Sequence, residues 1–458
     1  MKIKAFICFL FFLPFIIVSF CNHPTLDDYW NANTIAEFGR LGAAVHLYNT
    51  VSGRFFSNLM MSICNTLPAN NVLLFKLAPV IFLLMLGCSF YYLLISIFKK
   101  EAAKKQLIIA AVVFVALHLV NMRSLYEGLY WTSAVFVYQL TLIIFVCGIA
   151  SIFTYLHTKK IIYCIAAIGC SFVLAGTAES IVPVYLVLLL LIAVKQYHQK
   201  KQFLFLLSCI IALLIGTAIV LLSPGNYKRI AYDTTFYQQD VLFAITRSLS
   251  TIGYYVLVWG INLVSIGTIL LMLPYCLKYT QRLLKFFPLV LQKFNPFIVA
   301  VIAFVLCASL YAPLYYFETG IPFPRVTAMV FVIALLFFIL LLCIFIDRYA
   351  WLAKQIIKLT GIKNYTLWSW LLLSIGLFTS RNFLETSRDV LNGSAFTYNK
   401  ESLERYNLIR TNKNDTCYVT PYSKWPASFL PTMEENTGSE NFMHMDKYFG
   451  KTLLLKKK

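Results

Sequence analysis

The sequence predicts an all-α protein whose helices form a polytopic transmembrane bundle. Hydrophobic residues make up 60% and charged residues only 13% of the 458 residues, and the mean hydropathy is +0.75. This composition is typical of integral membrane proteins. Apolar segments also recur along the chain, and most approach the ~20 residues that a helix needs to cross a hydrocarbon core of ~30 Å. We predict about 11 spans, over residues 3–20, 71–98, 106–121, 132–156, 161–175, 181–194, 203–222, 251–276, 297–313, 326–346 and 365–379.

Basic residues favour one side of this bundle. With the N-terminus in the cytoplasm, the inward-facing ends and loops hold 19 of the 39 Lys and Arg residues, against 8 on the outer side and 12 in residues 380–458. This asymmetry follows the positive-inside rule and puts the C-terminus outside. Of the ten acidic residues before position 380, only Glu101 and Asp347 face inward. Because acidic residues contribute little to topology, their concentration outside predicts a polar site at the outer membrane surface.

The composition also excludes other classes of protein. The net charge of +20 comes largely from lysines that anchor the cytoplasmic side, so we expect no nucleic-acid partner. The apolar N-terminal run resembles a signal peptide, but no small-x-small cleavage site follows it, so we expect a retained first span. Most of the 12 cysteines lie inside apolar segments, where buried thiols are expected.

Two regions follow from this pattern. Residues 1–379 form the transmembrane domain, which includes a long first outer loop, residues 21–70, whose helical pattern is broken at glycines. Aromatic residues in that loop are typical of helices at the membrane interface. Residues 380–458 form a small extracytoplasmic C-terminal region with a helix near 398–410 and a strand near 416–420. It is too small and polar to build a large core alone, so we expect it to pack over the outer loops.

Asp27 and Asp28 are the sharpest catalytic candidates, because they follow directly after the first predicted span. Partial burial there would raise a carboxyl pKa towards the range of a general base, and Asp28 could instead bind a divalent metal, although no cofactor is certain. The spacing also has a structural interpretation. Thr25-x-x-Asp28 fits a helix capping box, with the acid where the helix dipole favours it. The sequence leaves both interpretations open.

Arginines at the outer ends of spans form a second group of candidates. A guanidinium offers a bidentate fork that suits phosphate, and the positive-inside bias should deplete arginine on this side. Snorkelling of single arginines to lipid headgroups is the competing interpretation. We predict that a lipid phosphate or pyrophosphate is bound by Arg54, Arg123, Arg229 and Arg325, together with Asn226 of the Ser-Pro-Gly-Asn turn.

Glu127 and Glu179 form a third group. An ionisable residue so close to hydrocarbon is a functional candidate by default, and a simple helix-end turn is the competing interpretation. Tyr126, Tyr130 and Trp131 beside Glu127 could stack on a sugar or belong to an interfacial aromatic belt. We expect the carboxylates and guanidinium groups to gather in one hollow that opens away from the cytosol.

Several catalytic motifs are absent from the sequence. It has no Walker-type glycine loop, no HExxH and no paired CxxC, and it has no G-x-S-x-G elbow. These absences argue against an ATP-driven pump, a zinc protease and a serine hydrolase.

An acidic pair in a long first outer loop, interfacial helices, many spans and an outer tail together resemble the GT-C class of glycosyltransferases. Within that class, one succession of motifs resembles a bacterial family of multi-pass membrane proteins of unknown function, over nearly the whole chain. The motifs are DDYW, GRFFSN, YEGLYWTSAVFVY, AGTAES, SPGNYKR and PFPR.

The resemblance implies an enzyme of the cytoplasmic membrane that transfers a sugar from a polyprenyl-phosphate carrier to a glycan or lipid acceptor on the outer face. It implies that Asp27 or Asp28 binds a metal or activates the acceptor. It also implies that Arg229 and Arg325 hold the lipid phosphate, while the two glutamates line the cavity. The short C-terminal region departs from better-known members, which often carry a large soluble domain.

Three other functions stay open. They are a lipid-linked glycan transporter or flippase, a glycan polymerase or ligase, and a non-catalytic membrane scaffold. A flippase would need polar residues at the mid-depth of the spans, whereas the span centres are largely apolar. A polymerase or ligase would share the outer arginines and the lipid-phosphate donor, so the sequence separates it poorly. In a scaffold, the acids would only cap helices.

Overall fold

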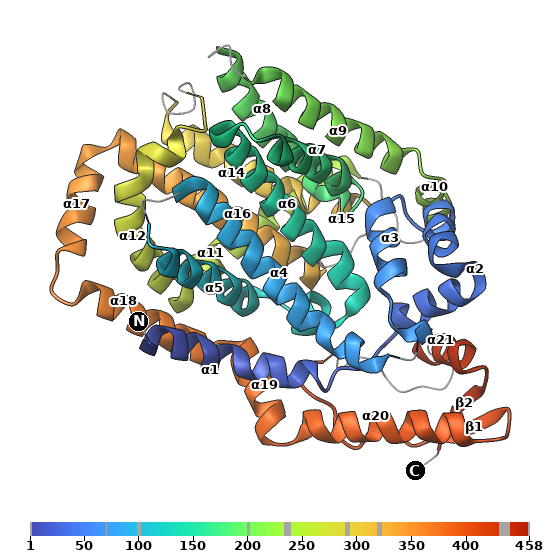
Figure 1. The fold of residues 1–458 in the computed structure, drawn as a ribbon. Helices are drawn as coiled ribbons and strands as arrows, with labels where there is room; N and C mark the ends of the chain where they lie inside the picture. The colour runs from blue at the N-terminus through green and yellow to red at the C-terminus, as the bar shows by residue number, and fades with distance from the viewer. Residues whose placement is uncertain are drawn as a thin grey trace.

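Apolar α-helices form the body of the protein (Figure 1). The structure, a computed structural model, describes residues 2–69, 71–98, 102–198, 202–232, 240–288, 294–317, 323–429 and 440–456. Within these residues, 8 helical segments are long and apolar enough to cross a membrane. They are α4 (Val72–Phe98), α5 (Lys104–Asn121), α6 (Thr132–Thr158), η3 with α8 (Glu179–His198), α9 (Phe203–Leu221), α11 (Val241–Ile261), α12 (Leu263–Leu284) and α16 (Pro324–Arg348). Shorter apolar helices are α1 (Lys2–Ser19), α3 (Phe55–Cys64), α7 (Ile161–Ala175), α14 (Pro296–Ser309) and α18 (Tyr365–Thr379).

The prediction of a helical membrane bundle is confirmed, while the number and orientation of its spans stay predictions. Most predicted segments coincide with one helix to within a few residues. The single segment predicted over 251–276 is wrong, because two helices meet there at Asn262. The Asn262 side chain accepts a hydrogen bond from Val264 N–H at 2.9 Å, so it caps the start of α12. The segment predicted over 297–313 also runs past the end of α14 into the short α15 (Ala312–Phe317).

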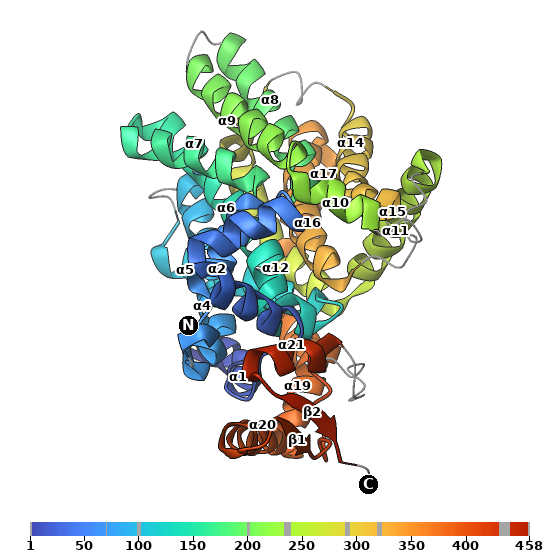
Figure 2. The ribbon, with the colours of Figure 1, turned by 90° about the vertical axis from the view of Figure 1, so that its right-hand side faces the viewer.

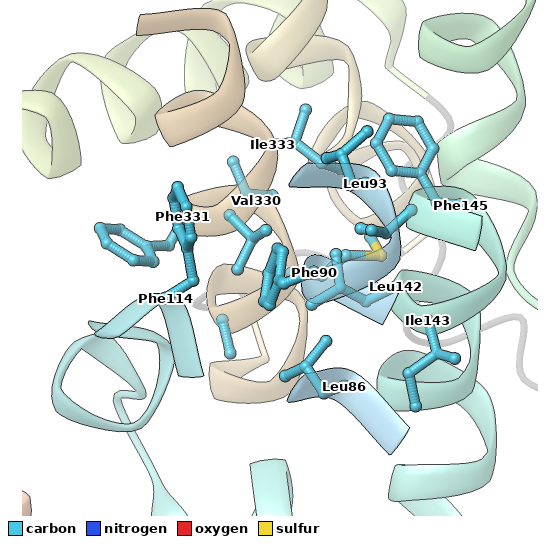
Figure 3. Packing of buried hydrophobic residues seen from close by; sticks show 14 of the residues in the cluster. Leu86, Phe90, Leu93, Phe114, Leu142, Ile143, Phe145, Val330, Phe331 and Ile333 are labelled. Carbon is cyan, nitrogen blue, oxygen red and sulfur yellow. The ribbon is translucent and has the colours of Figure 1, made fainter. Parts of the chain in front are cut away.

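Helix α6 lies within the core of the bundle. Its residues are apolar on every face, which is typical of a helix buried on all sides, and it packs against α4 and α7. Figure 3 shows where side chains of α4, α5, α6 and α16 meet. Phe90 of α4 stacks on Phe114 of α5 with ring centroids 5.1 Å apart, and both rings are buried. This close packing holds α5, α6 and α16 in fixed positions relative to one another.

Residues 21–70, the predicted first outer loop, are largely helical. They hold α2 (Asp27–Thr50), α3 and the short η1 (Leu67–Ala69). Helix α2 bends at Gly39, whose φ of 70° lies in the left-handed region that glycine adopts without strain. Arg40, the next residue, donates hydrogen bonds to the carbonyls of Ser62 (3.0 Å) and Asn65 (3.0 Å) at the end of α3. The expected helices broken at glycine are confirmed, and their position at a membrane interface stays a prediction.

The C-terminal region packs along one side of the molecule (Figures 1 and 2). The predicted helix and the predicted strand are both present in it, as α20 and β1. Tyr29 of α2 shares a hydrophobic cluster with Tyr406 and Leu453 of this region. Asn33 of α2 also donates a hydrogen bond to the His444 carbonyl at 2.8 Å. The region thus completes a core with the first outer loop, and the domain boundary at 379 stays a prediction. Its elements are α19 (Arg381–Leu391), α20 (Ser394–Thr411), β1 (Thr416–Val419), α21 (Glu440–Phe449) and β2 (Thr452–Leu455), with β1 and β2 paired in parallel.

The cysteines do not pair. All 12 are free thiols in the structure, and seven of them are buried: Cys8, Cys21, Cys209, Cys276, Cys307, Cys343 and Cys417. They behave as small apolar side chains.

Candidate functional site

A π-helical turn, η2 (Tyr126–Tyr130), joins α5 to α6 and forms the centre of the candidate site. Single π-turns are rare and frequently lie at functional sites. Tyr126 and Tyr130 are buried, while the Glu127 side chain is 15% exposed. The turn therefore presents one carboxylate at the end of the bundle where α2 and α16 begin.

The carboxylate of Asp28 connects α2 to the start of α6. Its Oδ1 accepts hydrogen bonds from Ser133 N–H at 3.1 Å and from Ser133 Oγ at 2.9 Å. Its Oδ2 accepts a hydrogen bond from Thr25 N–H at 3.2 Å. The residue before α6, Trp131, makes no side-chain cap, so Asp28 supplies an acceptor for the free N–H groups at that helix end. The Thr25 N–H···Asp28 half of the predicted capping box is therefore present, but the N-cap of α2 is Leu26, which makes no side-chain cap. Asp28 instead caps the start of α6.

Burial raises the pKa of Asp28 to about 7. Asp28 is only 3% exposed, and desolvation disfavours the charged form of a carboxyl group. The hydrogen bonds from Thr25 and Ser133 oppose this rise, and the charge of Asp27 adds to it. Asp28 therefore titrates near neutral pH while its oxygens are committed to donors of the protein.

Three carboxylates lie around Tyr126. Burial raises the pKa of Tyr126 well above its usual range, and the charges of Asp28, Asp27 and Glu127 raise it further. The Tyr126 hydroxyl also forms a hydrogen bond with the Thr25 hydroxyl. The acids of α2 and the acid of η2 thus share one neighbourhood, although they are far apart in the sequence.

Glu127 pairs with Arg325 at the start of α16. Oε2 of Glu127 lies 3.6 Å from an NH nitrogen of Arg325, and the two side chains are 15% and 17% exposed. The backbone N–H of Arg325, in the first turn of α16, also favours the charged form of Glu127 and so lowers its pKa. Glu127 thus lies near the N-terminus of α16, as Asp28 lies at that of α6. Burial raises the pKa of Glu127, and the charges of Arg325 and Arg123 oppose that rise. Both arginines are therefore within electrostatic reach of this carboxylate.

Aromatic rings surround the Arg325 guanidinium. Its Cζ lies 4.2 Å from the ring centroid of Phe323, 5.1 Å from that of Trp131 and 5.6 Å from that of Tyr138, all within the range of a cation–π contact. These rings hold the guanidinium in place.

Buried polar atoms around Arg325 have no hydrogen-bond partner among the described residues. Buried polar atoms are normally satisfied, so a polar ligand or a water molecule is the natural partner here. The atoms are closed off from solvent, so a ligand must displace side chains to reach them. The buried polar atoms without a partner are Glu127 Oε2, Trp131 Nε1, Thr132 Oγ1 and Arg325 Nε. We name the residues Asp27, Asp28, Arg123, Glu127, Trp131 and Arg325 the η2 cluster.

Arg123 lies at the edge of the η2 cluster. It is exposed, and one of its NH groups donates a hydrogen bond to the Tyr255 hydroxyl of α11 at 2.7 Å. The Arg123 guanidinium can therefore meet a ligand from solvent while α11 supports it.

The remaining predicted residues form a second group. Arg54 Nε donates to both carboxylate oxygens of Glu179, at 3.1 and 3.3 Å. The preceding residue, Gly53, donates its N–H to Asn226 Oδ1 at 2.9 Å, and Asn226 lies on α10 (Pro224–Tyr232). Arg229 is exposed one turn further along α10. Asn226 therefore fixes the backbone beside the Arg54–Glu179 pair rather than facing the η2 cluster.

The expectation of one hollow is not met within the described residues. Helix α3 stands between the two groups, since Arg54 precedes it and Met61, towards its other end, contacts Asn31 near Ser133. A cavity of about 580 Å³ lies elsewhere in the bundle, and none of the nine predicted site residues lines it. The candidate site is therefore the η2 cluster, which holds five of those nine residues.

Three residues of the site were missed from the sequence. Ser133 lies two positions after Trp131, and Phe323 lies two positions before Arg325, so both could have been found by their proximity to predicted residues. Tyr138 has no such signal, because only the packing of α6 against α16 brings its ring to Arg325.

The donor set around Asp28 does not fit a bound divalent metal. A carboxylate has about four lone-pair positions, and three hydrogen bonds already point at those of Asp28. Nor do three or more His, Cys, Asp or Glu side chains of the described residues lie in an arrangement that could hold a metal ion. We therefore derive no step through a metal.

No family model, curated protein or solved structure matches the chain. The resemblance to GT-C glycosyltransferases accordingly stays a prediction from the residues.

Proposed function

We propose that this protein is a glycosyltransferase of the cytoplasmic membrane, which uses a polyprenyl-phosphate-linked sugar donor on the outer face in cell-envelope glycan assembly. About 11 helices would span the bilayer, with the N-terminus inside and the C-terminus outside. Two contacts support the predicted sides of the helix ends, because each contact joins two ends that the prediction places on the same side of the membrane. Lys195 at the end of α8 donates to the carbonyl of Lys285 after α12, and Asn262 at the start of α12 contacts Asn121 at the end of α5 at 3.5 Å.

The observation that carries the proposal is the convergence of the η2 cluster. Its members come from the starts of α2 and α16 and from the connection between α5 and α6. Three carboxylates and two guanidinium groups meet there at the ends of helices whose central parts are apolar. Such charges are costly to bury beside hydrocarbon, and the N-termini of α6 and α16 at this place favour bound anions.

The residues then take distinct roles. Arg325 and Arg123 would hold the phosphate of the donor, since a guanidinium suits phosphate. Trp131 would stack on the sugar, and Glu127 would accept hydrogen bonds from sugar hydroxyls. Asp27 would be the general base, while Asp28 positions the start of α2 against α6. The Arg54–Glu179 pair and Asn226 would support α3 from outside the site.

The reaction is a single inverting displacement. The acceptor oxygen forms a bond to the anomeric carbon of the sugar as the bond from that carbon to the phosphate oxygen breaks. The proton of the acceptor hydroxyl passes to Asp27, and polyprenyl phosphate leaves with its negative charge beside Arg325 and Arg123. Fixed guanidinium groups stabilise charge that develops on a leaving group.

A flippase is the main rival. It needs a polar passage between the two membrane faces, whereas the cavity of about 580 Å³ has largely apolar walls. A polymerase or ligase would use the same donor chemistry, so the identity of its product separates it from a transferase of single sugars. In a non-catalytic scaffold, none of the three acids Asp27, Asp28 and Glu127 would take part in a reaction.

The test is complementation of a strain that lacks the gene, with mass analysis of its surface glycans. We expect Asp27→Asn, Arg325→Gln and Glu127→Gln each to abolish transfer, while the variant proteins reach the membrane in normal amounts. Glu37→Gln is the matched control, because Glu37 is an exposed acid of α2 that pairs with Lys447 at the surface. Normal glycans in both Asp27→Asn and Arg325→Gln would refute the proposal.

A further inference from the structure

The cavity of about 580 Å³ occupies the half of the bundle away from the η2 cluster. On α4 it is lined from Phe90 to the end of the helix at Phe98, and on α5 from the start of the helix to Phe114. Phe145 and Phe153 line it from the later half of α6, and Figure 3 shows Phe90, Phe114 and Phe145 in this part of the core. Its walls are therefore mostly hydrocarbon and aromatic rings.

The charges at this cavity are all of one sign. Among the described residues that line it, the charged ones are Lys4 of α1 and Lys105 of α5, both close to the starts of their helices. The ammonium group of Lys4 lies 4.8 Å from the ring centroid of Trp370, which also lines the cavity. Lysine can lay its aliphatic stem along an apolar wall and keep its charge at the mouth. The cavity thus has an apolar interior and a cationic rim.

An apolar space of this size inside a membrane protein needs an apolar occupant. Water in it would find few hydrogen-bond partners, and an empty space would forfeit the dispersion contacts of its walls. Its volume lies within the ~300–1,000 Å³ of pockets that hold small molecules. A lipid chain restores those contacts, and a lipid phosphate is attracted to juxtamembrane lysines.

We propose that this cavity binds one acyl chain of an anionic phospholipid, with the lipid phosphate held by Lys4 and Lys105. In the orientation given under the proposed function, on which this one point rests, Lys4 and Lys105 place the lipid in the cytoplasmic leaflet. The binding itself does not depend on transferase activity, because no residue of the η2 cluster takes part in it.

The experiment uses the full chain reconstituted in phosphatidylcholine vesicles that contain a trace of phosphatidylglycerol with a photoactivatable acyl chain. After illumination, adducts are mapped by peptide mass spectrometry. We expect them on cavity-lining residues such as Ala110, Val113 and Leu340. Phosphatidylcholine with the same photoactivatable chain should label these residues several-fold less.

The charge of the rim is tested with matched variants. The double variant Lys4→Gln and Lys105→Gln should lose most of the labelling inside the cavity. Lys104→Gln should keep it, because Lys104 is exposed like its neighbour Lys105 but does not line the cavity. Ala110→Phe, which narrows the cavity without changing charge, should also reduce labelling.

Three outcomes would overturn the proposal. One is labelling confined to lipid-facing surface residues such as Leu204. Another is equal labelling by phosphatidylglycerol and phosphatidylcholine. The third is displacement by unlabelled polyprenyl phosphate at lower concentration than by unlabelled phosphatidylglycerol, which would assign the cavity to the carrier lipid. None of these measurements uses glycan transfer, so this proposal and the proposed function can fail separately.

Discussion

Asp28 near the start of α2 accepts two hydrogen bonds from Ser133 near the start of α6, at 2.9 and 3.1 Å, although 105 residues separate them in the chain. A third hydrogen bond, from Thr25 N–H, fixes the other carboxylate oxygen. One buried side chain thus ties α2 to a central helix of the bundle, and it does so beside Glu127 and Arg325.

The contacts of Asp28 predict a loss of stability in Asp28→Ala. The substitution leaves the N–H groups of Thr25 and Ser133 without their acceptor, and each buried donor left unpaired costs about 1–3 kcal/mol. Thermal unfolding of the purified protein in detergent should show a lower midpoint. Glu37→Ala, at an exposed acid of the same helix, is the control, and an unchanged midpoint for Asp28→Ala would contradict the capping role.

The raised pKa of Asp28 predicts a pH-dependent stability. The folded state holds a proton on Asp28 up to about pH 7, whereas the ordinary pKa is 3.8, so the folded protein binds more protons between these values. Stability from this group is fully present below pH ~3.8 and is lost as pH rises through ~7. Since one pKa unit corresponds to ~1.36 kcal/mol, the loss amounts to a few kcal/mol.

The measurement compares the wild type with Asp28→Asn, which cannot titrate, at pH values from 5 to 8. The unfolding midpoint of the wild type should fall relative to that of the variant as pH rises. The exposed Glu37→Gln serves as control. Parallel curves for the wild type and Asp28→Asn would show that the carboxyl group does not titrate in this range.

The Arg54–Glu179 pair predicts a modest coupling energy. Both carboxylate oxygens of Glu179 accept from Arg54 Nε, but the two side chains are 25% and 34% exposed. Solvent screening therefore limits the pair to about 0.2–1 kcal/mol. A double-mutant cycle with Arg54→Ala and Glu179→Ala, followed by thermal unfolding, measures this coupling energy. A coupling near zero would mean that the pair does not hold α3 in place.

Two glycines predict a close contact between α12 and α18. A Cβ on Gly267 would lie 2.6 Å from the backbone N of Leu373, and a Cβ on Gly376 would lie 2.6 Å from the backbone N of Val264. Small residues permit such close helix approach in membrane proteins. Gly267→Ala should therefore lower stability by about 1–3 kcal/mol through overpacking.

Gly260→Ala on α11 is the matched control, because a Cβ there meets nothing within 4 Å and alanine favours a helix. The unfolding midpoint of Gly260→Ala should stay unchanged or rise. Equal midpoints for the Gly267 and Gly260 variants would contradict the close packing of α12 on α18.

Local sequence patterns predicted a good part of the fold. Long apolar runs matched helices, because transfer into hydrocarbon depends mainly on each segment's own residues. The prediction over 251–276 was wrong because hydropathy averages over Asn262, whose side chain ends one helix and caps the next. The Thr25-x-x-Asp28 pattern correctly placed one hydrogen bond, since both partners lie within one turn.

The sequence by itself determined the membrane character of the chain, the positions of most helices and the hydrogen bond between Thr25 and Asp28 at the start of α2, because these depend on neighbouring residues. Only the tertiary structure decided that Asp28 also meets Ser133, that Glu127 meets Arg325 and that Arg54 meets Glu179 in a separate group. It alone also decided where the apolar cavity with Lys4 and Lys105 lies. Such contacts join residues more than 100 positions apart, so they follow from the packing of whole helices and not from spacing along the chain.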